Sequence, residues 1–167
     1  MTKLLLSVHV LAAILTVGSI TVAASMFPRY ALQAFGDGGE GGRPAATAAL
    51  LHRICRAYAL VGLAVPVFGI ATGAQLGVLT DVWLITSLAL TTIAAVLLAM
   101  AILPGQQRLL ALAQEAPSQH VPTQAAPTEE AARSTATRLA MLTGIFNILW
   151  AVVVILMIVR PGSTTGA

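Results

Sequence analysis

Four long apolar runs divide the chain, and glycine, proline and charged residues gather between them. Each run holds 21 to 24 residues and contains no Asp, Glu, Lys or Arg. A helix rises about 1.5 Å per residue, so each run is long enough to cross a bilayer core about 30 Å thick. The pattern predicts an all-α fold, a single integral membrane domain whose four transmembrane helices cover residues 4–27, 57–79, 82–103 and 139–159.

The connections between the runs differ in length. Residues 36–43 are rich in glycine and residues 116–127 carry three prolines, so we expect both to be flexible loops. Only Thr80 and Asp81 join the second run to the third, which predicts a tight antiparallel hairpin. The first run has small residues at 23–25, as a cleavable signal peptide would, but it exceeds the usual apolar length of about 7–15 residues. We therefore interpret it as a retained membrane helix.

Prolines are expected to shape the helices. Pro28 should bend the first helix, and Pro66 should kink the second, because proline lacks a backbone N–H and its ring clashes with the preceding turn. Pro104 is expected to end the third span, followed by a short amphipathic surface helix over residues 106–115. Thr128 is predicted to cap the helix that becomes the fourth span.

Positive charges lie unequally on the two sides that four spans create. Both termini share one side, which holds Lys3 and Arg160. The other side holds seven arginines: Arg29, Arg43, Arg53, Arg56, Arg108, Arg133 and Arg138. Loops rich in Lys and Arg usually stay in the cytoplasm. We therefore expect two cytoplasmic loops, with the N- and C-termini outside.

Composition excludes several functional classes. Hydrophobic residues make up 57% of the chain and charged residues 9%, so the expected surroundings are a lipid bilayer. The net charge of +3 is scattered over membrane-flanking loops and does not predict a nucleic-acid groove. The spans hold no carboxylate, which disfavours a proton-coupled transporter. No catalytic set is visible; His52 and Cys55 supply only two metal ligands, and His52 is expected at the headgroups beside Arg53.

Three glycines recur every four residues near the end of the second span, at Gly69, Gly73 and Gly77. Small residues at this spacing let another helix backbone approach closely in a membrane. One interpretation is the seam of a homodimer, and the other is packing against the first or fourth helix of the same chain. The second is favoured, because such spacing is common in transmembrane helices.

Counting the helical rise places several polar side chains at one depth. His9 lies about 8 Å from the start of the first span, and Gln75, Thr86 and Ser87 fall at that distance from the same membrane face. Asn147 lies deeper, about 18 Å from the end of the last span. These side chains either satisfy one another's hydrogen bonds or form a ligand pocket, in which His9 binds a ligand or carries a proton.

A motif in the first span supports a family resemblance. Residues Ser7–Ala13, the following Gly18 and the segment Phe27–Tyr30 form a pattern that resembles small four-helix bacterial proteins described as predicted integral membrane proteins. The pattern is more distantly similar to the HemJ-type protoporphyrinogen oxidases and the copper-resistance D family, in which a glycine follows a histidine of the first helix. This resemblance implies a location in the bacterial inner membrane.

The same resemblance implies a haem for which His9 is the axial ligand. The chain departs from a bis-histidine pattern, because His52 is expected at the opposite membrane face and His120 in a loop. The second ligand would then come from a second copy of the chain or from a methionine, or the protein binds no haem.

Together these patterns favour a multi-pass membrane protein that is not an enzyme and needs no cofactor. Its expected partners are the bilayer and either a second copy of itself or a larger membrane complex. The alternative is a haem- or quinone-linked redox protein that uses His9. A small transporter comes third, for want of a carboxylate within the spans.

Overall fold

The computed structural model describes residues 2–36, 42–115 and 122–162. All regular structure in these ranges is helical. The elements are α1 (Thr2–Gly36), α2 (Gly42–Val61), α3 (Ala64–Leu76), α4 (Val82–Leu97), the π-helical turn η1 (Leu98–Ile102), α5 (Leu103–Glu115) and α6 (Pro122–Val159). Four stretches are long and apolar enough to cross a membrane: Lys3–Phe35, Gly42–Leu76, Val82–Gln114 and Glu129–Val159. For the described residues, the prediction of an all-α fold with four helices long and apolar enough to span a membrane is confirmed.

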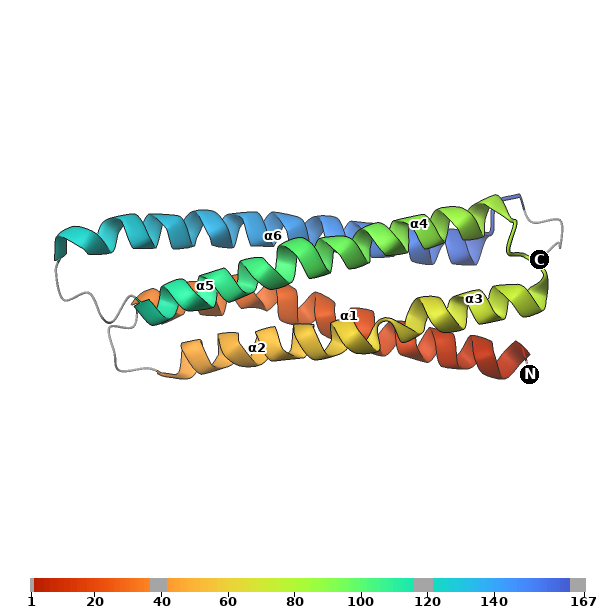
Figure 1. Cartoon of the computed structure of the whole chain (residues 1–167), viewed down its shortest axis with the longest axis horizontal. Coiled ribbons are helices and arrows are strands. Elements are labelled where there is room, and N and C mark those ends of the chain that lie inside the picture. The colour runs from red at the N-terminus through yellow and green to blue at the C-terminus, as the bar shows by residue number, and fades with distance from the viewer. Residues whose placement is uncertain (1, 37–41, 116–121, 163–167) are drawn as a thin grey trace.

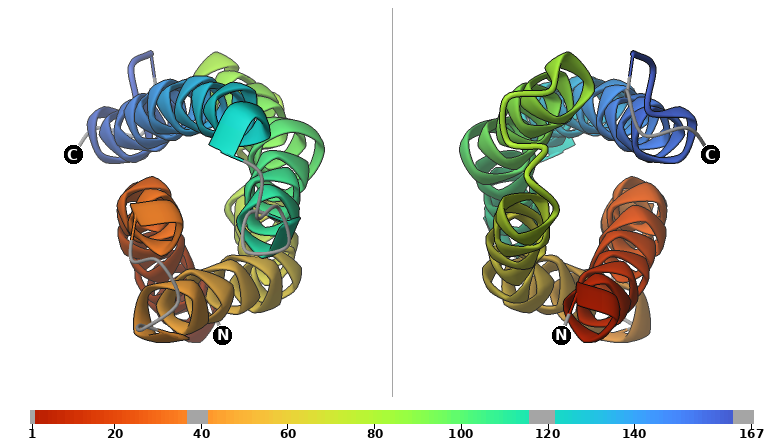
Figure 2. Two further views of the ribbon diagram at one scale, coloured as in Figure 1. Left: turned by 90° about the vertical axis from the view of Figure 1, so that its left-hand side faces the viewer. Right: turned by 90° about the vertical axis from the view of Figure 1, so that its right-hand side faces the viewer.

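The helices lie along one common axis and surround it in the order α1, α2 with α3, α4 with α5, and α6 (Figures 1 and 2). The start of α1 and the end of α6 lie at the same end of the bundle, as four spans require (Figure 1). We call this the terminal end and the half of the bundle next to it the terminal half. The opposite end, where α1 and α5 finish and α2 and α6 begin, is the loop end, and the half next to it is the loop half.

The second span is interrupted between α2 and α3, close to the predicted proline kink. Gly62 and Leu63 form a turn, and Pro66 becomes the third residue of α3. A proline is tolerated in the first turn of a helix, where its missing N–H would have no helical partner. The chain therefore breaks before Pro66, and the carbonyl of Gly62 accepts a short-range bond from the N–H of Val65 at 3.1 Å.

The third span continues past Pro104, which corrects the prediction that it ends there. The turn η1 precedes the proline, and the N–H of Leu103 bonds to the carbonyl of Leu98, five positions earlier. This wider turn relieves the clash between a proline ring and the preceding turn of an α-helix. Residues 106–115 are consequently part of the bundle rather than a surface helix, and Leu109 is fully buried.

Two other helices are also longer than the apolar runs. α1 passes through Pro28 without interruption and ends at Gly36. α6 begins at Pro122, so residues 122–127 are helical although we expected a loop, and Thr128 is not its cap. A proline suits the first position of a helix, and the Gln and Ala residues that follow favour helix. The remaining parts of the two expected flexible loops, residues 37–41 and 116–121, lie outside the described ranges.

The two halves of the bundle are packed differently. In the loop half, small side chains such as Ala48 and Ala132 are fully buried and let the helices close around Phe27, which is also fully buried. In the terminal half, α3 packs mainly against α1 and α4 mainly against α6, while α3 and α4 make a smaller contact in which Leu84 lies against Gly73. The connection between them is short, as the sequence predicts, but each helix packs more extensively against another neighbour than against the other arm of this hairpin.

Candidate functional site

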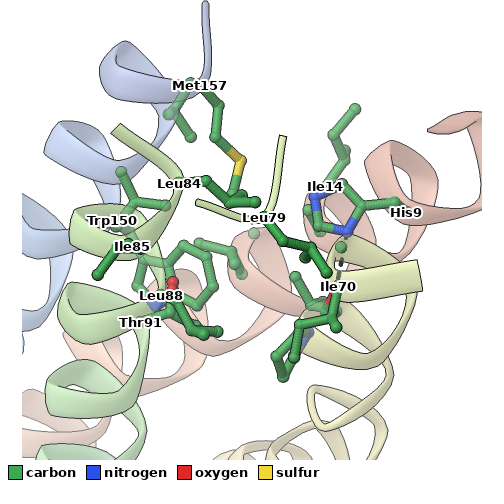
Figure 3. A pocket seen from close by; sticks show the side chains of 18 residues that line it. His9, Ile14, Ile70, Leu79, Leu84, Ile85, Leu88, Thr91, Trp150 and Met157 are labelled. Atoms are coloured by element: carbon green, nitrogen blue, oxygen red, sulfur yellow. Dashed lines mark hydrogen bonds between the residues drawn. The ribbon is translucent and has the colours of Figure 1, made fainter. Parts of the chain in front are cut away.

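Side chains of α1, α3, α4 and α6 enclose an apolar cavity in the terminal half of the bundle (Figure 3). Its volume is about 330 Å³, and a second space of about 360 Å³ adjoins it and shares His9, Gly69 and Met157 among its lining residues. We call the two together the terminal cavity. The aliphatic part of its lining includes Ile14, Ile70, Leu84, Ile85 and Leu88. Concave apolar spaces of this size are typical of sites for small molecules.

His9 lines both parts of the terminal cavity and is only 7% exposed. Its Nδ1 lies 2.9 Å from the backbone carbonyl oxygen of Val65 on α3 (Figure 3). A carbonyl oxygen can only accept a hydrogen bond, so Nδ1 of the neutral ring carries the proton and Nε2 carries the lone pair. An imidazole held in this way can offer Nε2 to a metal ion or to a hydrogen-bond donor.

Gly69 on α3 provides the space in which the His9 ring lies. A Cβ atom at position 69 would be 3.0 Å from Cε1 and 3.3 Å from Nδ1 of His9. A side chain there would displace the ring, which is fixed by its bond to the α3 backbone. Gly69 therefore packs against the first helix of its own chain, as the internal-packing interpretation expects.

The other two glycines of the series have different surroundings. A Cβ on Gly73 would lie 2.9 Å from Cδ2 of Leu84, the flexible end of a side chain on α4. Gly77 ends α3 with a φ of 70°, a conformation that favours glycine, and a Cβ there would meet nothing within 4 Å. The expectation that Gly77 packs against another helix is therefore wrong. The three glycines do not form one packing face, because the last of them lies beyond the helix end.

Met157 brings a sulfur atom to the cavity that contains His9, from α6 on another side of the space (Figure 3).

The terminal end of the cavity has a polar rim. Cζ of Arg160 lies 5.5 Å from the centroid of the Trp83 ring, and Nε1 of Trp83 donates a hydrogen bond to Oδ2 of Asp81 at 3.0 Å. Trp83 and Arg160 both line the cavity, which is therefore apolar inside and polar at the bundle end.

The structure does not assemble the predicted polar layer through side-chain hydrogen bonds to His9. That ring bonds to the backbone of α3 instead. Ser87 Oγ and Thr86 Oγ1 donate to carbonyls four positions earlier in α4, at 2.8 and 2.7 Å. Ser87 is fully buried, whereas Thr86 and Gln75 are exposed. Equal depth did not bring these groups together, because depth contains no information about the rotation of each helix around its axis.

Asn147 joins α6 to α1 deeper in the bundle. Thr21 Oγ1 donates a hydrogen bond to Asn147 Oδ1 at 3.1 Å. This bond joins two residues that are 126 positions apart in the chain. Within the described ranges, three buried polar atoms have no hydrogen-bond partner: Thr16 Oγ1, Thr143 Oγ1 and Trp150 Nε1. Of these residues, Trp150 lines the terminal cavity.

A buried polar network in the loop half was not predicted. His52 Nδ1 lies 2.9 Å from Gln106 Oε1, and Gln106 Nε2 lies 3.6 Å from Cys55 Sγ. Gln106 is 1% exposed and Cys55 is fully buried. His52 therefore lies inside the bundle, because α5 continues the third span and covers this face of α2. Its expected depth at the headgroups stays a prediction. The spacing of His52 and Cys55 is visible in the sequence, but Gln106 follows a proline expected to end the span.

The chain matches no protein-family model, no curated protein and no solved structure. The resemblance seen in the first span therefore stays a prediction. The terminal cavity combines an apolar space of ligand size with the buried imidazole of His9, and it is therefore the candidate functional site.

Proposed function

We propose that this protein is a non-enzymatic component of the bacterial inner membrane that packs, through its terminal half, with a second copy of itself or with a larger membrane complex. The observation that supports this most directly is the separation of α3 and α4 beside the terminal cavity. Ile70 of α3 and Ile85 of α4 line the cavity and are 45% and 55% exposed. Membrane helices associate through close packing, so two helices left apart favour a partner that fills the space between them.

Disulfide cross-linking in native membranes tests this proposal. On a Cys55→Ser background, Ile70→Cys and Ile85→Cys place thiols on α3 and α4 beside the cavity. Val22→Cys on α1 is a matched control, because Val22 is 58% exposed but does not line the cavity. We expect oxidation to link the first two variants to a partner and to leave the control monomeric. The mass of the cross-linked product identifies the partner as a second copy or another protein. Monomers in all three variants would contradict packing with a second copy, which brings the same thiol to the contact.

We also infer that the loop end faces the cytoplasm, which would place both termini outside. The loop end carries seven arginines, whereas the terminal end carries one lysine and one arginine, and this difference supports the orientation. On a Cys55→Ser background, we expect Gly42→Cys to resist a membrane-impermeant maleimide in intact cells and Ser163→Cys to react. The reverse labelling pattern would invert the orientation. Cell lysis should make Gly42→Cys reactive, which shows that its thiol is accessible to the reagent.

The second candidate function is a haem- or quinone-linked redox protein, and the position of His9 favours it. The ring is held by the backbone of α3 with Nε2 as the lone-pair atom, and Met157 Sδ belongs to the same cavity. Histidine and methionine together are a known ligand pair for haem iron. A bound haem or quinone would supply electron transfer, and His9 would hold the haem iron or accept a hydrogen bond from a quinol hydroxyl.

Absorption spectroscopy separates the two candidates. If the redox function is correct, protein purified in mild detergent should show a Soret band for haem, or release a quinone on organic extraction. His9→Phe and Met157→Leu should remove or shift this signal. Met100→Leu should not, because Met100 is 76% exposed and lies outside the cavity. Protein that carries neither cofactor would exclude the redox candidate and leave the packing proposal in place.

A further inference from the structure

A separate pocket lies near the loop end, between the start of α5 and α6. Its volume is about 390 Å³, and its lining includes Arg108 of α5 together with Ser134, Thr135 and Arg138 of α6. Pro104 and Gly105 form its wall on α5. A Cβ on Gly105 would lie 2.8 Å from Cδ2 of Leu139, so the glycine allows α5 and α6 to approach closely here. We call this space the arginine pocket.

The charges of the arginine pocket are not neutralised by the described part of the chain. The ion pair among the described residues is Arg133–Glu129, at 3.8 Å between exposed side chains of α6, and neither residue lines this pocket. Neither Arg108 nor Arg138 has an ion-pair partner among the described residues. Arginine side chains present planar pairs of N–H groups, which match the oxygens of a phosphate. Two of them from two helices therefore provide an anion site suited to a phosphodiester.

The two hydroxyl groups of the pocket complement this charge. Ser134 Oγ and Thr135 Oγ1 both donate their protons to the carbonyl of Ala131, at 3.0 and 2.8 Å. Their remaining lone pairs can accept hydrogen bonds, so they suit a ligand that carries hydroxyl donors beside its phosphate. Inorganic phosphate at neutral pH offers few donors, whereas a glycerol headgroup offers two.

The pocket changes from polar to apolar along the axis of the bundle. α5 ends and α6 begins at the loop end (Figure 1), so Arg108 and Ser134 are nearer to that end than Met100 and Leu142 are. Met100 is 76% exposed, so its side chain is available to an acyl chain. A ligand with an anionic head and apolar tails fits both parts, and basic pockets between membrane helices are suited to such lipids.

We propose that the arginine pocket binds the headgroup of an anionic phospholipid, with the phosphate at Arg108 and Arg138 and a headgroup hydroxyl at Ser134 or Thr135. Phosphatidylglycerol has this chemistry, with one net negative charge and free hydroxyl groups. The site is separate from the terminal cavity and does not depend on the function proposed for it.

Native mass spectrometry of the full chain in mild detergent tests this site. We expect phosphatidylglycerol to bind about tenfold more tightly than phosphatidylcholine, since each arginine near a lipid phosphate contributes favourably. Arg108→Gln with Arg138→Gln should remove most of this preference. Arg53→Gln with Arg56→Gln is the matched control: both arginines are exposed on α2 and lie outside the pocket, so the preference should persist.

A conservative variant and a soluble competitor show which part of the lipid the pocket recognises. Arg138→Lys retains the charge but loses the planar pair of donors, so its preference should fall between those of the wild type and the double variant. Soluble glycerol 3-phosphate should compete poorly, because it lacks the acyl chains that contact Met100 and Leu142. Equal binding of both lipids, or an unchanged preference in the double variant, would overturn the proposal. Full competition by glycerol 3-phosphate would overturn the lipid assignment in favour of a free phosphate ester.

Discussion

Replacing Gly69 with leucine is expected to lower the free energy of unfolding by about 1–3 kcal/mol, the usual effect of overpacking a close contact. The glycine lies against the imidazole of His9, where even a Cβ would be 3.0 Å from Cε1. The ring cannot move aside without losing its 2.9 Å hydrogen bond to the carbonyl of Val65. Thermal unfolding in mild detergent measures the effect.

A matched control is Gly144→Leu, because a Cβ at Gly144 would meet nothing within 4 Å. We expect that variant to retain wild-type stability. The destabilisation by Gly69→Leu should also shrink in a His9→Ala background, since the ring that it displaces is then absent. Gly73→Leu should cost less than Gly69→Leu, because the atom it meets is the movable end of Leu84. Equal unfolding temperatures for the Gly69 and Gly144 variants would contradict the close contact.

Gln106→Leu should destabilise the loop half by about 1–3 kcal/mol, the cost of leaving a buried donor without a partner. Gln106 is 1% exposed, and its Oε1 lies 2.9 Å from Nδ1 of His52. Leucine fills the space but accepts no hydrogen bond, so the N–H of His52 loses its partner. Cys55 also loses the N–H that points to its sulfur at 3.6 Å.

Two comparisons isolate this hydrogen bond. Gln107→Leu changes the neighbouring exposed glutamine in the same way and should leave stability nearly unchanged. The double variant His52→Leu with Gln106→Leu removes both partners, and such paired replacement by apolar groups is often close to neutral. It should therefore be more stable than Gln106→Leu alone. A double variant that loses the sum of both single effects would show that the side chains act independently.

The different packing of the two halves suggests a division of roles. The loop half has a compact core with buried alanines and the His52–Gln106–Cys55 network, which specifies how α2 and α5 meet. The terminal half contains the cavity, its His9 and the separated helices α3 and α4. The terminal half is less tightly packed than the loop half, and a loosely packed region beside a cavity is suited to binding a partner or ligand. This difference is why we place the proposed partner contact in the terminal half.

Much of the architecture follows from the sequence alone. The four apolar runs predict four membrane-spanning helices, because a bilayer requires a length of about 20 apolar residues and internal hydrogen bonding of the backbone. The proline at position 66 predicts the interruption near Gly62, since its ring crowds the preceding helical turn, although α1 accommodates Pro28 without a break. Pro104 misled the same reasoning, because a π-helical turn can absorb a proline and let the helix continue.

The partners of the polar side chains were decided by tertiary structure. Sequence spacing gives the depth of His9, Asn147 and Ser87 in a membrane, but their partners depend on how each helix is rotated and which helix lies beside it. His9 thus bonds to a backbone carbonyl of α3 rather than to Gln75, and Asn147 bonds to Thr21. Rise along a helix is fixed by backbone geometry and can be counted. Rotation is set by side-chain packing between helices, and it becomes known only when the helices are assembled.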